Sequence, residues 1–181
     1  ETLLTFEHKK DPENPAQTRL AVNQTVAEAP TLVVGARPCG LRGLSAMDKV
    51  FLGGRFKDPY YQARRDTAAF VAVACARPER TCFCNWTGGG PADRTNADVL
   101  LTPVAGGYVA EACTAVGEEL LAAGSFADAG PKAEEAKAVQ AKAEAAMPAK
   151  PDFADLPEKL SRLFEDAAFW EEMAAKCLSC G

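Results

Sequence analysis

The chain has 181 residues, of which 48% are apolar and 25% are charged, and its net charge at pH 7 is −5. This composition is typical of a chain with a globular core, and no segment approaches the about 20 consecutive apolar residues that a membrane-spanning helix needs. The acidic balance argues against a general nucleic-acid surface, because such surfaces are usually basic.

An irregular segment and a strand are predicted first. Residues 1–28 are mixed and polar, and prolines interrupt any regular pattern. The apolar, β-branched run at residues 31–35 predicts a buried strand. Residues 36–40 are expected to form a loop at the carboxyl end of this strand.

Two helices and a second strand are predicted next. Apolar residues at helical spacing predict a helix from residue 41 through about residue 51, and two glycines end it. Asp58 followed by Pro59 is typical of a helix start, so we expect a short helix through Arg65. The apolar run at residues 68–75 predicts a second buried strand, which ends in a cysteine.

A long loop, a hairpin and two helices follow. Residues 76–97 have no clear periodicity and predict a loop of a length that is usually functional. Residues 98–104 and 108–112 predict two strands joined by a turn at two glycines, with a short helix over 117–123. The Ala-, Lys- and Glu-rich residues 131–147 predict an exposed helix that buries little and serves as a solvated spacer.

The last predicted helix begins at Asp155 to Glu158, which has the form of a capping box, and leads into a C-x-x-C-G sequence at residues 177–181. The elements predict an α/β fold with a small mixed sheet, which has a parallel core pair and a hairpin, flanked by helices and followed by a C-terminal helical extension. We expect three parts, namely an α/β domain over 1–126, a helical spacer over 127–151, and a helix leading into the cysteine motif over 152–181.

Four of the seven cysteines form the candidate site. Cys39 and Cys75 lie at the carboxyl ends of the two predicted parallel strands, and Cys82 and Cys84 lie in the long loop. Because such strand ends meet at one edge of a sheet, we expect the four thiols to converge. Four thiolates hold a [4Fe–4S] cluster, and they also suit tetrahedral zinc. The remaining alternative is a set of buried structural thiols, which is the reading we prefer for Cys113.

The terminal pair, Cys177 and Cys180, begins like a ferredoxin-type cluster motif, which adds two further cysteines. Two thiolates do not saturate a four-thiolate site, and the chain starts at Glu1 rather than at a methionine. We therefore expect the chain to be a piece of a larger redox protein in which both cysteines are metal ligands. His8 is the sole histidine, which excludes a catalytic triad and a histidine-rich metal site.

Four segments occur in the order of a known family. Residues 35–42 read Gly-Ala-Arg-Pro-Cys-Gly-Leu-Arg, residues 58–65 begin Asp-Pro-Tyr-Tyr and end Arg-Arg, and residues 81–84 read Thr-Cys-Phe-Cys. With the terminal motif, they resemble segments of the iron–sulfur β-type subunits of cytoplasmic hydrogenases and sulfhydrogenases, and of the A subunit of anaerobic sulfite reductase. The resemblance covers most of residues 31–181. Gly40 departs from it, since the family usually has Asp there.

The resemblance implies an iron–sulfur electron-transfer subunit in the cytoplasm. Such a subunit would relay electrons between a flavin- or NAD(P)-linked subunit and a catalytic redox subunit, and would catalyse nothing alone. The C-terminal motif would open a ferredoxin module. The alternative is a metal-free or zinc-stabilised structural domain that docks the ferredoxin module to its partner. Neither reading includes a nucleic acid or a membrane span.

Overall fold

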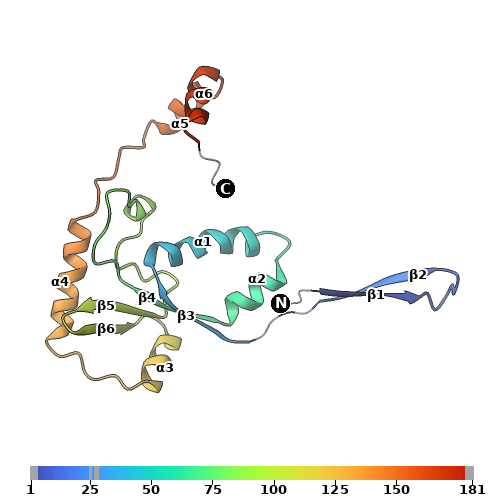
Figure 1. Cartoon of the computed structure of the whole chain (residues 1–181), viewed down its shortest axis with the longest axis horizontal. Coiled ribbons are helices and arrows are strands. Elements are labelled where there is room, and N and C mark those ends of the chain that lie inside the picture. Colours follow the sequence, from blue (N-terminus) through green and yellow to red (C-terminus); the bar gives the residue numbers. More distant parts are fainter. Residues whose placement is uncertain (1–3, 25, 27–28, 178–181) are drawn as a thin grey trace. The chain divides into compact units, whose positions relative to one another are not determined.

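The computed structural model describes residues 4–24, 26 and 29–177. The chain divides into two compact units, Glu1–Pro148 and Ala149–Gly181. The larger unit contains a four-stranded sheet with helices beside it and a separate two-stranded ribbon (Figure 1). The predicted α/β class, with a mixed sheet that combines parallel strands and a hairpin, is confirmed.

The four-stranded sheet has the order β3-β4-β5-β6. Its strands are β3 (Thr31–Ala36), β4 (Ala68–Val73), β5 (Val99–Val104) and β6 (Gly107–Ala112). β3 and β4 pair in parallel, β4 and β5 also pair in parallel, and β5 and β6 form the predicted antiparallel hairpin. The parallel part therefore has one strand more than the predicted pair, because the long loop after β4 crosses over to β5.

Two helices connect β3 to β4, as predicted. α1 (Pro38–Leu52) has proline at its first position and ends at Gly53. α2 (Pro59–Asp66) begins after Asp58, whose Oδ1 accepts hydrogen bonds from the next two free backbone N–H groups at 2.9 and 2.8 Å. This cap satisfies amide donors that a helix otherwise leaves without partners.

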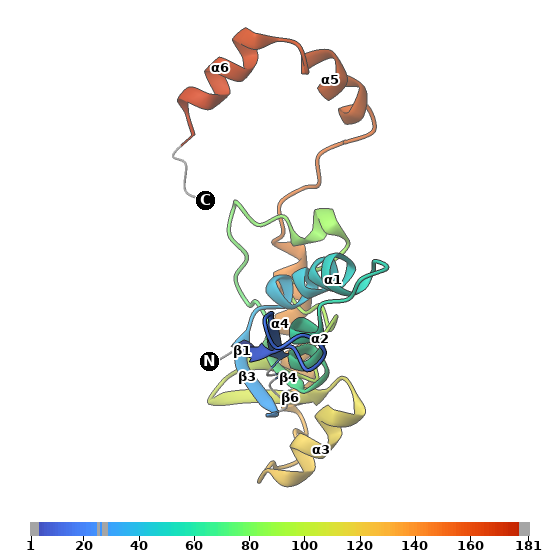
Figure 2. The same cartoon turned by 90° about the vertical axis from the view of Figure 1, so that its right-hand side faces the viewer.

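The core of the sheet is built largely from alanines. Leu41 of α1 lies in one buried cluster with Ala72, Ala74, Ala97 and Leu100. Small side chains on β4 let a helix come close to the sheet, and Leu100, which is fully buried, fills the space between them. Figure 2 shows α1 and α3 on opposite faces of the sheet.

β3 is a strand, as predicted, but its predicted burial is wrong. Its side chains are mostly exposed, with Leu32 at 52% and Val34 at 64% relative exposure. The physical reason is its position, because β3 is the edge strand and pairs only with β4 among the described strands. An apolar run is buried on both faces only where other elements cover both faces of a parallel sheet.

Asp98 joins three elements at the start of β5. Its Oδ2 accepts a hydrogen bond from the Phe70 N–H of β4 at 2.8 Å, and its Oδ1 accepts one from the Thr114 hydroxyl at 2.6 Å. Thr114 in turn caps α3 (Ala115–Ala123), since its Oγ1 accepts from the Gly117 N–H at 3.2 Å. The α3 helix is thereby fixed to the sheet.

α4 (Lys132–Ala145) is a helix, as predicted, but it is not solvated on all sides. Ala136 and Ala143 are 4% and 1% exposed, and α4 contacts β5 and β6. The Lys132 ammonium donates to the Ala105 carbonyl at 2.6 Å, and the Glu135 carboxylate accepts from the Ala105 N–H at 2.7 Å. A face of alanines buries little area per residue but allows close approach, which composition alone did not reveal.

One prediction tests the docking of α4. The Gln140 amide donates to the Thr102 hydroxyl at 2.7 Å, and Thr102 is 2% exposed. Replacing Gln140 with alanine leaves a buried hydroxyl without this donor, and should lower the free energy of unfolding by about 1–2 kcal/mol. Lys137→Ala is the control on the same helix, because Lys137 pairs only with exposed Glu134. Equal effects of the two changes in urea denaturation would contradict the docking.

The polar segment before residue 28 contains an antiparallel ribbon that the sequence reasoning missed. β1 (Leu4–Lys10) pairs with β2 (Thr18–Gln24), with Phe6 opposite Val22 and His8 opposite Leu20. The prolines that interrupt the pattern lie between the strands. The missed signal is the alternation of apolar and polar residues in both strands, which places the apolar ones on one face.

The smaller unit has two helices where one was predicted. They are α5 (Leu156–Leu163) and α6 (Ala167–Ala175). Asp155 precedes α5 and pairs its carboxylate with Lys159 at 2.7 Å instead of closing a capping box. The Trp170 indole donates to the Leu163 carbonyl at 2.7 Å, which fixes the bend between the helices.

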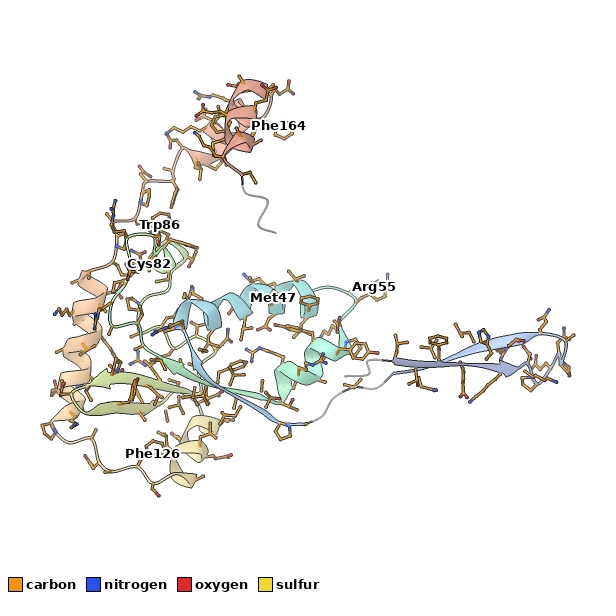
Figure 3. The ribbon with its side chains drawn as sticks, viewed as in Figure 1. Met47, Arg55, Cys82, Trp86, Phe126 and Phe164 are labelled. Atoms are coloured by element: carbon orange, nitrogen blue, oxygen red, sulfur yellow. The ribbon has the colours of Figure 1, made fainter. Side chains whose placement is uncertain are left out.

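Several large apolar side chains are exposed, among them Met47 and Phe126 of the larger unit and Phe164 of the smaller (Figure 3). Helices long and apolar enough to cross a bilayer are absent from the described part of the chain.

Candidate functional site: a thiol-lined pocket

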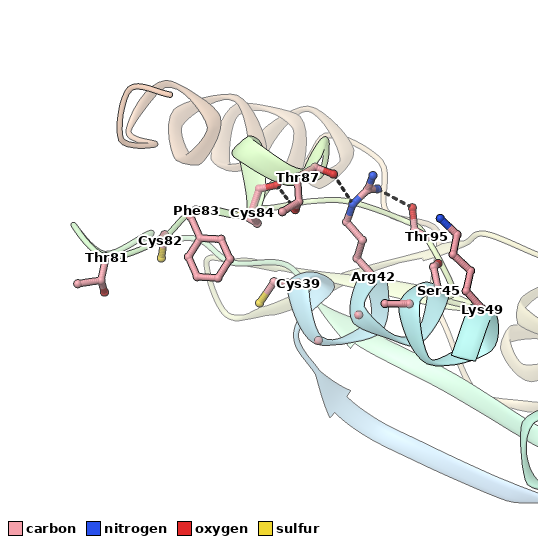
Figure 4. A pocket seen from close by; sticks show the side chains of 13 residues that line it. Cys39, Arg42, Ser45, Lys49, Thr81, Cys82, Phe83, Cys84, Thr87 and Thr95 are labelled. Atoms are coloured by element: carbon pink, nitrogen blue, oxygen red, sulfur yellow. Dashed lines mark hydrogen bonds between the residues drawn. The ribbon is translucent and has the colours of Figure 1, made fainter. Parts of the chain in front are cut away.

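A pocket of about 780 Å³ lies between α1 and the loop that follows β4. Figure 4 shows Cys39 on α1 facing the loop segment that carries Cys82, Phe83 and Cys84. The pocket therefore brings together three of the four predicted site cysteines from two distant parts of the chain. Its lining comprises Cys39, Gly40, Arg42, Gly43, Ser45, Ala46, Lys49, Thr81, Cys82, Phe83, Cys84, Thr87 and Thr95.

The sequence reasoning expected Cys39 in a loop, but it lies in the first turn of α1. Pro38 starts the helix three residues earlier than the apolar spacing indicated, because a proline is well tolerated where the amide has no helical partner. The position matters chemically, since the amino end of a helix carries partial positive charge and attracts anionic groups. Cys39 is exposed and so is open to the pocket.

Cys82 and Cys84 lie in a tightly hydrogen-bonded stretch of the loop. The Glu79 N–H donates to the Cys82 sulfur at 3.1 Å, and the Cys82 N–H donates back to the Glu79 carbonyl at 3.0 Å. A short 3₁₀ helix, Cys84–Thr87, follows and ends at Gly88, whose φ of 79° suits glycine. This part of the loop has a defined conformation even though its sequence shows no periodicity.

The three pocket thiols influence one another electrostatically. The pKa of the Cys84 thiol is raised, first by burial and then by the Cys39 and Cys82 thiols beside it. A backbone hydrogen bond from Asn85 acts in the opposite direction. Bringing several thiolates together without a cation is unfavourable, so the arrangement favours either protonated thiols or a bound metal group that neutralises them.

Cys75 is placed at the end of β4, as predicted, but it is not among the described residues that line this pocket. It is partly buried, and its N–H donates to the Pro91 carbonyl at 2.8 Å. Cys113 lies outside the pocket, as expected for a structural thiol, and packs against the core cluster. Cys177 is exposed two residues after α6, and Cys180 lies outside the described residues.

Within the described residues, no group of three or more Cys, His, Asp or Glu side chains is placed to hold a metal ion. A single ion draws its ligands to one centre, whereas a cluster binds each thiolate to a different iron and keeps the sulfurs farther apart. The donor type, the pocket volume and the N–H groups directed at sulfur fit an iron–sulfur cluster. Because Cys75 does not line the pocket, the described residues bring three thiols to it and lack a fourth ligand for such a cluster.

Two of the motif arginines, Arg42 and Arg65, pair with carboxylates of the same unit. Arg65 pairs with Asp48 at 3.2 Å, and the Tyr61 hydroxyl donates to the same carboxylate at 2.7 Å. A second Arg65 nitrogen donates to Asn96, whose amide donates to Ser45 Oγ at 3.0 Å. These contacts join α1, α2 and the loop.

Sequence reasoning missed the polar half of the pocket. Lys49 of α1, Thr87 and Thr95 line the pocket although nothing in their local sequence marks them as site residues. The helical spacing of Arg42 and Lys49 from Cys39 was the available signal, since residues three, seven and ten apart return to one helix face. Both residues carry a positive charge, of which that of Arg42 is paired with the Asp93 carboxylate.

A run of three glycines at residues 88–90 follows the 3₁₀ helix. It borders a second, more polar pocket of about 480 Å³ beside α4. The carboxylates of Asp93 and Glu144 line that pocket, and a Cβ at Gly90 would lie 2.8 Å from Glu144 Oε2. Carboxylates this close argue against a phosphate cradle at the glycines.

The sequence is similar to a curated hydrogenase component. It is 27% identical over 176 residues to the sulfhydrogenase 2 subunit beta of Pyrococcus furiosus, covering 88% of this chain and 48% of that relative. The chain thus spans about half the length of the relative. No family model matches the chain, and no solved structure matches it significantly. The similarity to a sulfhydrogenase beta subunit bears out the family resemblance that the cysteine and arginine motifs predict.

Proposed function

We propose that the chain is part of an iron–sulfur electron-transfer subunit of a hydrogenase-type complex, and that its thiol-lined pocket holds a [4Fe–4S] cluster. Cys39, Cys82 and Cys84 would supply three ligands, and Cys75, which follows β4 but does not line the pocket, is the candidate for the fourth. The observation that carries the proposal is the convergence of three thiols, from α1 and from the loop, on one pocket. The similarity to a sulfhydrogenase beta subunit supports it.

Charge complementarity also supports this assignment. A cluster with four thiolates is an anion, and the pocket combines the amino end of α1 with the cations Arg42 and Lys49. When bound, such a cluster accepts and donates single electrons. The chain would hold it through the thiolates, and the Glu79 N–H on the Cys82 sulfur would tune its reduction potential.

The subunit's role is a relay. Electrons would pass between a flavin- or NAD(P)-linked subunit and a catalytic redox subunit in the cytoplasm, and the chain itself would not catalyse a reaction. Cys177 and Cys180 would bind iron as the opening of a ferredoxin module. In that arrangement α5 and α6 would lead the chain from the α/β domain to the module.

The proposal predicts that replacing both Cys82 and Cys84 with serine removes the pocket's cluster. After anaerobic reconstitution, bound iron and acid-labile sulfide should fall by about four atoms each per chain, the content of one [4Fe–4S] cluster. The paramagnetic signal of the reduced protein should be lost with them. Cys113→Ser is the matched control, because Cys113 packs against the core and not into the pocket. Unchanged iron and an unchanged signal in the double variant would refute the proposal.

The alternative is a metal-free or zinc-stabilised domain that docks the ferredoxin module. One observation bears on it: no described group of three side chains is placed to hold a metal ion, which fits the metal-free form and not the zinc-stabilised form. Metal analysis of the purified chain separates the possibilities. Zinc with no sulfide, together with loss of folding in the Cys82/Cys84 double variant, would identify a structural zinc site. A folded double variant and no metal in either protein would identify a docking domain.

A further inference from the structure

Arg42 joins the two walls of the pocket. It lies on α1, and its guanidinium contacts three residues of the loop, of which Figure 4 shows Thr87 and Thr95. Its Nε donates to the Thr87 carbonyl at 3.1 Å, and one terminal nitrogen donates to Asp93 Oδ2 at 3.0 Å and to the Thr95 hydroxyl at 3.3 Å. One side chain from the helix thus holds the loop at two points, before and after the glycine run.

The loop backbone is shaped around this guanidinium. A Cβ at Gly89 would lie 2.8 Å from Arg42 Cδ and 2.9 Å from Asp93 Oδ2, and one at Gly88 would lie 3.1 Å from an Arg42 terminal nitrogen. The glycines therefore allow the main chain to lie directly on the arginine. Such close approach is a reason for glycine at both positions.

A short path connects Arg42 to the cysteines. The Cys84 carbonyl accepts from the Thr87 hydroxyl and from the Gly89 N–H, both at 2.9 Å. Thr87 is the residue whose own carbonyl accepts from Arg42. The position of Cys84 therefore depends on the same turn, at Thr87 and Gly89, to which Arg42 is hydrogen-bonded.

The ion pair has the properties of a stable contact. The side chains of Arg42 and Asp93 are 31% and 14% exposed. Burial acts to raise the pKa of the Asp93 carboxyl, but hydrogen bonds from Thr95 and from Arg42 outweigh it and lower the pKa. Asp93 therefore remains ionised at neutral pH. Its pairing leaves the guanidinium engaged with the loop.

We propose that Arg42 is a positioning residue that holds the loop closed over Cys39 and thereby sets the spacing of the pocket thiols. The inference deepens the proposed function, because the spacing would be that of the cluster's ligands. Arg42 lies three residues after Cys39 in α1, so both lie on one face of the helix. That face presents one thiol of the pocket together with the arginine that positions the loop carrying the other two. Lysine is a poor substitute, since a compact ammonium lacks the planar fork that reaches three acceptors.

The test measures thiol spacing in the metal-free full-length chain. Dibromobimane joins two thiols that lie close together, and mass spectrometry after digestion identifies the Cys39–Cys84 adduct. Arg42→Met should lower the initial rate of this cross-link about tenfold, the shift expected when a charge-assisted hydrogen bond that closes the loop is lost. Arg42→Lys should fall between Met and the parent, because it keeps the charge.

Arg94→Met is the matched control. Arg94 pairs with Glu111 through two hydrogen bonds, at 2.8 and 2.9 Å, but it ties the loop to β6 and does not line the thiol pocket. Its cross-linking rate should equal that of the parent chain. Circular dichroism verifies that each variant is folded, and Asp93→Asn provides the same test without changing the size of a side chain.

The outcomes separate this inference from the proposed function. Parent-like cross-linking in folded Arg42→Met or Asp93→Asn overturns the clamp, and so does an equal loss in Arg94→Met. If Arg42→Met is unfolded, the rate in Asp93→Asn decides. Failure of the parent chain to bind iron would refute the cluster while leaving the cross-linking comparison intact. Where iron does bind, Arg42→Met should also alter the paramagnetic spectrum, which Arg94→Met should leave unchanged.

Discussion

Replacing Leu100 with alanine is expected to lower the free energy of unfolding by about 3–4 kcal/mol. Leu100 is fully buried, and its buried neighbours include Ala72, Ala74 and Ala97. Alanine side chains cannot turn to fill a cavity, so little of the lost volume can be recovered. The loss should therefore fall in the upper part of the range for such changes. Urea denaturation followed by circular dichroism measures it, with an unchanged dependence on urea concentration.

Leu32→Ala is the matched control for this prediction. Leu32 has the same side chain on the same sheet but is 52% exposed on the edge strand β3. Its replacement should cost about 1 kcal/mol or less, because the side chain removes less apolar area from water. A loss as large as that of Leu100→Ala would show that the exposed side of β3 is covered in solution.

Replacing Gly117 with alanine is expected to destabilise the fold by about 3 kcal/mol. A Cβ at Gly117 would collide with the Asp98 carbonyl oxygen and would lie 2.8 Å from the carbonyl carbon. The obstacle is backbone that also accepts a hydrogen bond from the Cys113 N–H at 2.7 Å. Neither α3 nor β5 can move away without breaking contacts of the sheet, so relieving the clash costs free energy of folding.

Gly43→Ala gives the contrasting result. Gly43 is also a helical glycine, but no described atom lies within 4 Å of a Cβ built there, apart from its own helix. Alanine favours the helix by up to about 1 kcal/mol relative to glycine, so this variant should melt at a higher temperature than the parent. Calorimetry of the two variants should therefore give shifts of opposite sign. Shifts of the same sign would contradict the placement of α3 against β5.

The sequence was informative wherever a local signal decides the structure. Gly53 and the Asp58-Pro59 pair mark helix ends through backbone chemistry, and the structure confirms those ends, whereas the helix start at Pro38 was placed in a loop. The two glycines between β5 and β6 also predicted the turn correctly. In the structure Gly106 has a φ of 78°, which suits glycine. Cys39, Cys75, Cys82 and Cys84 were selected as candidates because thiols are scarce and chemically specific, and the first, third and fourth of them line one pocket.

The errors concern relations between distant segments. The run at β3 has the composition of a buried strand, but its exposure depends on which elements cover it. The alanine face of α4 gave no amphipathic signal, yet Gln140 and Ala143 dock on the sheet. Arg42 could not be assigned a role, since its partners lie 45 to 53 residues away in the chain.

The strand order of the sheet would also set the order of events in the assembly of the proposed cluster. β5 and β6 are neighbours in sequence, and such a hairpin forms in about 1–10 μs. The parallel pairs β3–β4 and β4–β5 join segments far apart in the chain and form more slowly. The two walls of the thiol pocket come from before and after β4, so the pocket exists only once both parallel pairs are made. Iron and sulfide delivered earlier would meet separated cysteines, and we therefore expect maturation to follow folding of the chain.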